Sequence, residues 1–130
     1  MEIFKKNTSA YTTGTDEALY DLSILVEMDD DEYLLEMLSI LLTDVPKDLK
    51  EMKKAVQAGK PAMVCQAAHK LKGSAGIIQA TKLTELLVDI EAIGKDGVIN
   101  KDLACLVDNA ANEYSSIEKK LKIYVQELNK

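Results

Sequence analysis

Apolar residues recur at steps of three and four along most of this chain, which is the period of amphipathic helices. Such stripes cover residues 34–56, 64–78, 83–93 and 103–128, and a shorter one covers residues 19–26. Each long stripe can be buried only against neighbouring helices. The pattern therefore predicts an all-α fold, an antiparallel up-and-down four-helix bundle with a short extra N-terminal helix covering one end.

The boundaries of the first two helices follow from capping residues. Thr15 and Asp16 are candidate caps for the short helix, which should end near Met28. The acidic run at residues 29–32 supplies an N-cap and first-turn negative charge for the next helix, whereas a Ca²⁺ loop would need ligands and a glycine at fixed offsets. Pro46 lies inside that helix, where we expect it to kink or restart the chain.

Glycine and proline mark the later boundaries. Gly59 suits the position after a helix and Pro61 the first turn of the next, which should run to about Gln79. Thr81 is the expected N-cap of the fourth segment, and Gly94 is expected to end it. After a turn at residues 95–100, Asn100 should cap the last helix.

Length and composition fit a single helical domain. The chain has 130 residues, of which 47% are hydrophobic, with no Trp, one Phe and two prolines. This composition favours helices over a turn-rich β fold. Residues 1–14 are polar and without period, so we expect a flexible N-terminal arm followed by one domain over residues 15–130. The initial Met and the complete last helix favour a stand-alone protein.

Several classes of protein are disfavoured by composition. Cys65 and Cys105 form neither a disulfide framework nor a metal-binding spacing, so we interpret both as reduced thiols. No signal peptide is evident in residues 1–15, and no stretch of about 20 apolar residues could cross a membrane. The net charge of -6 argues against a nucleic-acid surface and is suited to plain solubility. We expect a soluble cytoplasmic protein without membrane insertion.

The chain's one histidine, His69, falls on an unusual helix face. If Leu71 points inward, His69 lies about 160° away and faces solvent. The outward residues around it are small or uncharged, where a soluble helix usually carries Glu, Lys and Arg: Ala62, Cys65, Gln66, Gly73 and Gly76. Since a mid-helix glycine costs about 1 kcal/mol relative to alanine, this clearing suggests that another protein approaches the imidazole.

The chemistry available at this face is nucleophilic. A neutral imidazole has a free lone pair and can attack phosphorus. Lys72, at i+3 from His69, can bring a positive charge to the same patch, although it could equally be an ordinary solvated lysine. Cys65 and His69 are spaced as two metal ligands, but a site needs three or four, so we expect no metal site. No nucleotide-binding loop follows a strand, because no convincing strand is present, so the chain should not take phosphate from ATP by itself.

The residues around His69 carry a known motif. The run His69-Lys70-Leu71-Lys72-Gly73-Ser74, preceded by Ala68, closely resembles the A-H-x-L-K-G-S motif of histidine-containing phosphotransfer (HPt) domains. The likeness extends over residues 19–94 and includes the Asp44-Val45-Pro46 kink and the helix at residues 86–91. One departure is Gln79, where HPt proteins usually have glycine ten residues after the histidine, so the turn there could differ in geometry.

The resemblance implies a phosphorelay. His69 would accept a phosphoryl group from the phospho-Asp of a receiver domain and pass it to another, with Lys72 supporting the phosphoryl group. The receiver would supply Mg²⁺, and the chain, expected to be a monomer, would need no cofactor of its own. Response-regulator receivers and a hybrid sensor histidine kinase would be the partners. The docking face implied by the likeness comprises Ala62, Cys65, Gln66, Lys70, Gly73 and Gly76.

The family likeness also assigns a role to Glu91. It maps to a position where HPt proteins often carry Gln or Glu beside the histidine, and it could accept the Nδ1 proton of His69, although a solvated helix charge is an even alternative. The main rival function is a non-catalytic helical adaptor that binds a partner by the same face. A stand-alone enzyme would need a pocket, which a core of Leu, Ile and Val does not suggest.

Overall fold

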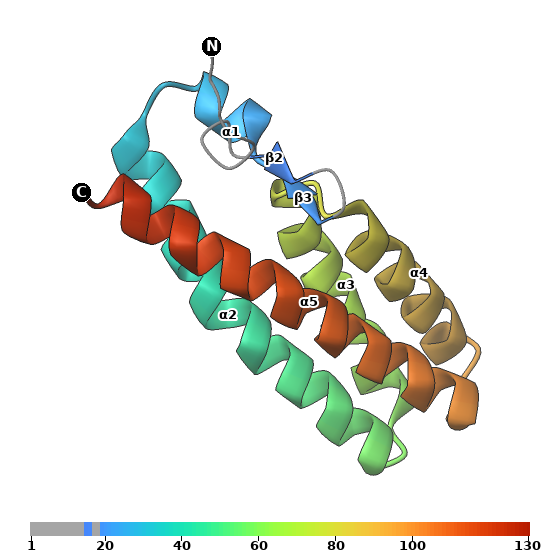
Figure 1. Ribbon diagram of the computed structural model, residues 1–130. Coiled ribbons are helices and arrows are strands. Elements are labelled where there is room, and N and C mark those ends of the chain that lie inside the picture. Colours follow the sequence, from blue (N-terminus) through green and yellow to red (C-terminus); the bar gives the residue numbers. More distant parts are fainter. Residues whose placement is uncertain (1–14, 17–18) are drawn as a thin grey trace.

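The computed structural model describes residues 15–16 and 19–130 and consists almost entirely of helices (Figure 1). The expected arm at residues 1–14 lies outside the described residues. The elements, in chain order, are β2 (Thr15–Asp16), β3 (Tyr20–Asp21), α1 (Ser23–Glu27), α2 (Asp31–Gln57), α3 (Pro61–Ile77), α4 (Thr81–Lys95) and α5 (Lys101–Leu128).

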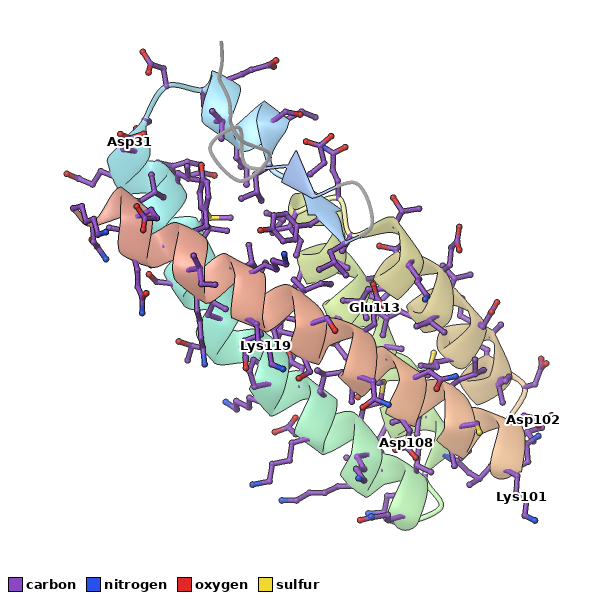
Figure 2. The ribbon with its side chains drawn as sticks, viewed as in Figure 1. Asp31, Lys101, Asp102, Asp108, Glu113 and Lys119 are labelled. Carbon is purple, nitrogen blue, oxygen red and sulfur yellow. The ribbon has the colours of Figure 1, made fainter. Side chains whose placement is uncertain are left out.

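The four long helices form the predicted antiparallel bundle. α3 packs between α2 and α4, and α5 completes the bundle between the same two helices, diagonally across from α3. Asp31 begins α2 at one end of the bundle, and Lys101 and Asp102 begin α5 at the other (Figure 2). Core residues come from the predicted apolar stripes, among them Leu38, Leu71, Leu87 and Ile117, which are all fully buried. The all-α fold prediction is therefore confirmed. Among the described residues, no helix is long and apolar enough to cross a bilayer.

The segment before α2 differs from the prediction. The N-cap of the short helix is Leu22, and Thr15 and Asp16 instead form β2, which pairs antiparallel with β3 through Thr15–Asp21 and Asp16–Tyr20. Tyr20 and Leu22 are both buried, with half-buried Asp21 between them, which is the alternation of extended chain and not of a helix. α1 begins only at Ser23, whose N–H donates to the Asp21 carboxylate at 2.8 Å. A five-residue helix forms too few backbone hydrogen bonds to extend the helical conformation back to residue 15.

α2 is continuous through Pro46, so the prediction of a restart was wrong. The helix begins as predicted, with the Asp30 side chain accepting from the Tyr33 N–H at 3.0 Å. Proline removes one backbone hydrogen bond from the helix interior. Buried residues on both sides of it, such as Val45 and Met52, hold the helix in the core regardless. Packing of the apolar face thus outweighs the local cost of Pro46.

The turn between α3 and α4 contains Gln79 in the left-handed region, with φ of 50°. The Ala80 N–H donates to the Ala75 carbonyl at 2.9 Å, the six-to-one bond of a Schellman motif. The same bond closes α2, where Lys60 donates to Ala55 around Gly59, whose φ is 68°. Gln79 therefore adopts the geometry that glycine provides at the end of α2. Gln79, which stands where the family usually has glycine, therefore keeps the left-handed backbone of the turn but adds strain to it.

We expect Gln79→Gly to stabilise the protein by about 0.5–1 kcal/mol, because glycine enters the left-handed region without the steric cost that a Cβ brings. The measurement is the free energy of unfolding in urea. Gln79→Ala is the matched control, since it shortens the side chain but keeps the Cβ. Equal stability of the glycine and alanine variants would contradict the strain at this position.

The ends of α4 also required correction. Thr81 is the first residue of the helix, whose N-cap is Ala80. Gly94 does not end α4, because the helix continues to Lys95. Gly94 is the second-last residue of the helix and is buried. The turn that follows places Gly97 at φ 75° instead. Asn100 caps α5 as predicted, its side chain accepting from the Leu103 N–H at 2.8 Å.

Candidate functional site

His69 lies on the outer face of α3, with its side chain 73% exposed. Ala68 and Leu71 on either side of it are buried, so they fix the rotation of the helix. Of the residues placed on the inward stripe, Val64, Ala75 and Ile78 are also buried, whereas Ala67 and Ser74 are half-buried at its edge. The core therefore holds α3 in the rotation that presents the imidazole to solvent.

Glu91 reaches His69 from the neighbouring helix α4. Its Oε2 lies 2.9 Å from Nδ1 of His69, and its side chain is only 9% exposed. An ionised carboxylate can only accept a hydrogen bond, so this contact favours the tautomer of His69 that has its proton on Nδ1. The lone pair of the ring then resides on Nε2, the other nitrogen of an exposed side chain. This contact orients the ring and selects its tautomer.

Lys72 completes the cluster. Its Nζ lies 2.6 Å from Oε1 of Glu91, so the two carboxylate oxygens bind Lys72 and His69 respectively. Lys72 is 29% exposed, less than a freely solvated lysine. The structure thus brings together His69, Lys72 and Glu91, the three residues to which the sequence assigned chemical roles. It adds a Lys72–Glu91 ion pair that the sequence did not predict.

The charge of Glu91 is stabilised by these neighbours. The hydrogen bond from Lys72 is the largest influence, and together with the bond from His69 and the positive charges of Lys72 and Lys95 it lowers the pKa of Glu91. Burial acts in the opposite direction but is outweighed. Glu91 is therefore ionised at neutral pH, where it can hold the Nδ1 proton of His69.

The lowered pKa of Glu91 predicts a pH-dependent stability. A group whose pKa is lower in the folded than in the unfolded protein contributes stability above its unfolded value, and this is lost as pH falls through the folded value. The free energy of unfolding of the wild type should therefore exceed that of Glu91→Gln at pH 7, and the difference should shrink as the pH falls below about 4.5. Urea titrations of both proteins at several pH values measure it. A difference independent of pH would contradict the ionised state of Glu91.

The predicted docking residues surround His69 with different degrees of exposure. The exposed ones are Ala62, Gln66, Lys70, Gly73 and Gly76. Cys65 is half-buried, with its Cβ turned toward Gly94 of α4. A Cβ added at Gly73 or Gly76 would meet no atom within 4 Å, so neither glycine is required by packing inside the protein.

Lys70 is tied to the α2 side of this face. Its Nζ lies 3.2 Å from the carboxylate of Asp48, whose side chain is 10% exposed. Sequence reasoning missed Asp48, because it occupies a position in the apolar stripe of α2 between Val45 and Met52. A carboxylate in an otherwise apolar stripe was the available signal, since buried acids need a cationic partner.

Comparison with known proteins identifies the family of this chain. The Hpt domain profile matches residues 36–129, nearly three quarters of the chain. The chain belongs to the Hpt domain family. Among solved structures, the crystal structure of histidine-containing phosphotransfer protein B (HptB) from Pseudomonas aeruginosa PAO1 is similar, with a TM-score of 0.79 and 23% sequence identity over 87% of this chain and 98% of that chain. No curated protein sequence matches the chain significantly.

Membership of the Hpt family defines the general function. The chain is a phosphotransfer protein of the phosphorelay type, a phosphocarrier and not a kinase domain. The likeness to HptB supports the helical-bundle fold over 87% of this chain. Hpt domains act together with receiver domains in phosphorelays.

Proposed function

We propose that His69 accepts a phosphoryl group from the phospho-Asp of a receiver domain and passes it to the Asp of another receiver. The observation that carries this proposal is the exposed imidazole whose Nδ1 is bound to Glu91 at 2.9 Å. That contact leaves Nε2, the nucleophilic nitrogen, directed away from the bundle and accessible to a partner.

The transfer is a displacement at phosphorus. The Nε2 lone pair forms the N–P bond as the P–O bond to the receiver's aspartate breaks, and the carboxylate leaves with the electron pair. The imidazole ring gains positive charge in this step, and the ionised Glu91 stabilises that charge through the Nδ1 proton. Return of the group to a receiver reverses the same steps, so one arrangement serves both directions.

Lys72 supplies mobile positive charge at the site. Its ammonium group is bound to Glu91 one helical turn from His69, and its flexible side chain can move toward phosphoryl oxygens on Nε2. We expect Mg²⁺ and the aspartate to come with the receiver. This division would place half of the active site on each protein and would explain why a single chain offers so little reactive chemistry.

Exposed apolar side chains on α2, α3 and α4 would suit a protein partner. The Asp48–Lys70 ion pair marks a level at which α2 and α3 lie side by side. Measured along the helix axes from that level, Ile40 lies about 12 Å away on α2 and Ile77 about 10 Å away on α3. Because the two helices are antiparallel, both residues lie toward the same end of the bundle. Val88 lies one turn before Glu91 on α4. Ile40 is 50%, Ile77 40% and Val88 46% exposed. Their burial would stabilise a docked receiver, with Gly73 and Gly76 allowing close approach.

The test is transfer from a phosphorylated receiver. Receivers are phosphorylated with labelled phosphate, freed of donor, mixed with this protein, and sampled over time. The proposal predicts that label leaves at least one receiver and appears on this protein within the first samples. An adaptor that only binds would form a complex without acquiring label, and this result with every receiver that binds would overturn the proposal.

A further inference from the structure

A close contact between α3 and α4 lies beside the His69–Glu91 pair. Gly94 of α4 is buried, and a Cβ placed on it would lie 3.0 Å from the carbonyl oxygen of Pro61. The same Cβ would lie 3.2 Å from both the backbone nitrogen and the Cβ of Cys65. Backbone atoms cannot rotate away as a side chain can. Even the Cβ of an alanine here would therefore require α3 and α4 to shift by a few tenths of an ångström.

The position of this contact relates it to the site. Gly94 follows Glu91 by three residues on α4, and Cys65 precedes His69 by four residues on α3. Each spacing is about one helical turn. Because the helices are antiparallel, the Gly94–Cys65 contact and the Glu91–His69 hydrogen bond are successive contacts across the same interface. A displacement of the helices at one contact is transmitted to the next.

Helix propensity gives no reason for a glycine at this position. α4 continues beyond Gly94, so the residue does not end the helix, and its φ is not in the left-handed region. Gly94 is the second-last residue of α4, where glycine still has a lower helix propensity than alanine. Among the glycines of α3 and α4, Gly94 alone lacks room for a Cβ, since Gly73 and Gly76 have open space. Close helix approach is therefore the property that Gly94 provides.

We propose that Gly94 is a positioning residue, which sets the separation of α3 and α4 so that Glu91 reaches Nδ1 of His69. This inference rests on the proposed role of His69 for its functional meaning, but its geometric content stands separately. The 2.9 Å separation lies inside the range of about 2.7–3.2 Å that nitrogen–oxygen hydrogen bonds occupy in proteins. A shift of a few tenths of an ångström from Gly94 is large on that scale.

The experiment is ¹⁵N NMR of the histidine ring in Gly94→Ala at about pH 8.5, where an ordinary imidazole is neutral. The wild type should be mostly the Nδ1–H tautomer, and Gly94→Ala should become a mixture of tautomers. Ala92→Ser is the matched control, because it adds one atom to an exposed position of the same helix and should leave the tautomer unchanged. Cys65→Val, which adds a methyl group to the contact from α3, should shift the tautomer in the same direction.

A wild-type tautomer in folded Gly94→Ala and Cys65→Val would overturn the positioning role. The phosphotransfer assay separates this result from the proposed function. Loss of the tautomer preference with slower transfer supports both. A third outcome is that Gly94→Ala loses the tautomer preference while the wild-type protein never accepts phosphate. That outcome would support the role of Gly94 in the geometry and refute the proposed function.

Discussion

Replacing His69 by glutamine is expected to reduce phosphoryl acceptance from any receiver to background. Glutamine is polar and of similar reach, but its amide nitrogen has no available lone pair to attack phosphorus. Since His69 is the chain's one histidine, no other imidazole can substitute for it. The fold should survive, because the side chain is 73% exposed and surface substitutions typically change stability by about 0.5 kcal/mol or less.

The assay compares His69→Gln with the wild type at equal concentration, using the same phosphorylated receiver. Circular dichroism and thermal unfolding verify that both proteins are folded. Binding of the unphosphorylated receiver should persist, since the docking face around residue 69 is unchanged. Equal label on both proteins would exclude His69 as the acceptor.

Gly73→Gln is expected to slow transfer by about tenfold or more while stabilising the isolated protein. Gly73 is exposed one turn beyond His69, and a side chain added there meets nothing within the protein. Replacing an interior helical glycine should therefore raise the free energy of unfolding, by about 0.5–1 kcal/mol. A docked receiver would meet the new side chain, so the two effects should have opposite signs.

The control for Gly73→Gln is Ala111→Gln, which adds a glutamine side chain to an exposed small residue on α5, diagonally across the bundle from α3. It should transfer at the wild-type rate. Transfer at the wild-type rate by Gly73→Gln as well would contradict docking on the face around His69.

Much of this fold could be predicted because in the long helices the apolar period, the capping residues and burial in the core all agree. The apolar stripe of α5 keeps one period from Leu103 to Leu128, and Asn100 caps it as predicted. The orientation of α3 followed from Leu71 and its buried neighbours, which is why His69 could be placed on the outside. Strong periodicity over many residues leaves few alternative arrangements.

Predictions that relied on single residues were less successful, because tertiary contacts decide them. Pro46 was expected to kink or restart α2, but the helix does not restart there, because buried residues on both sides hold it in the core. Gly94 was interpreted as a terminator, whereas its lack of a side chain serves a contact with another helix that the sequence does not display. Short segments such as β2 and β3 lack a period long enough to be distinguished from a helical turn.

The residues of the candidate site could be predicted from the sequence, but the contacts between their side chains could not. The motif identified His69 and Lys72, and the family likeness indicated Glu91. That Lys72 binds Glu91, and that Asp48 binds Lys70, depends on how α2, α3 and α4 are spaced. Side-chain pairs between helices require the packed bundle, which one sequence does not determine at this detail.

The most direct test of the account is the location of the transferred phosphoryl group. The wild-type protein is labelled with ¹⁵N-histidine, phosphorylated by a receiver, and examined by ³¹P and ¹⁵N NMR, with peptide mass spectrometry to identify the residue. We expect one phosphoryl group bound to Nε2 of His69, with the proton retained on Nδ1. A phosphoryl group on Nδ1, or on any residue other than His69, would contradict it.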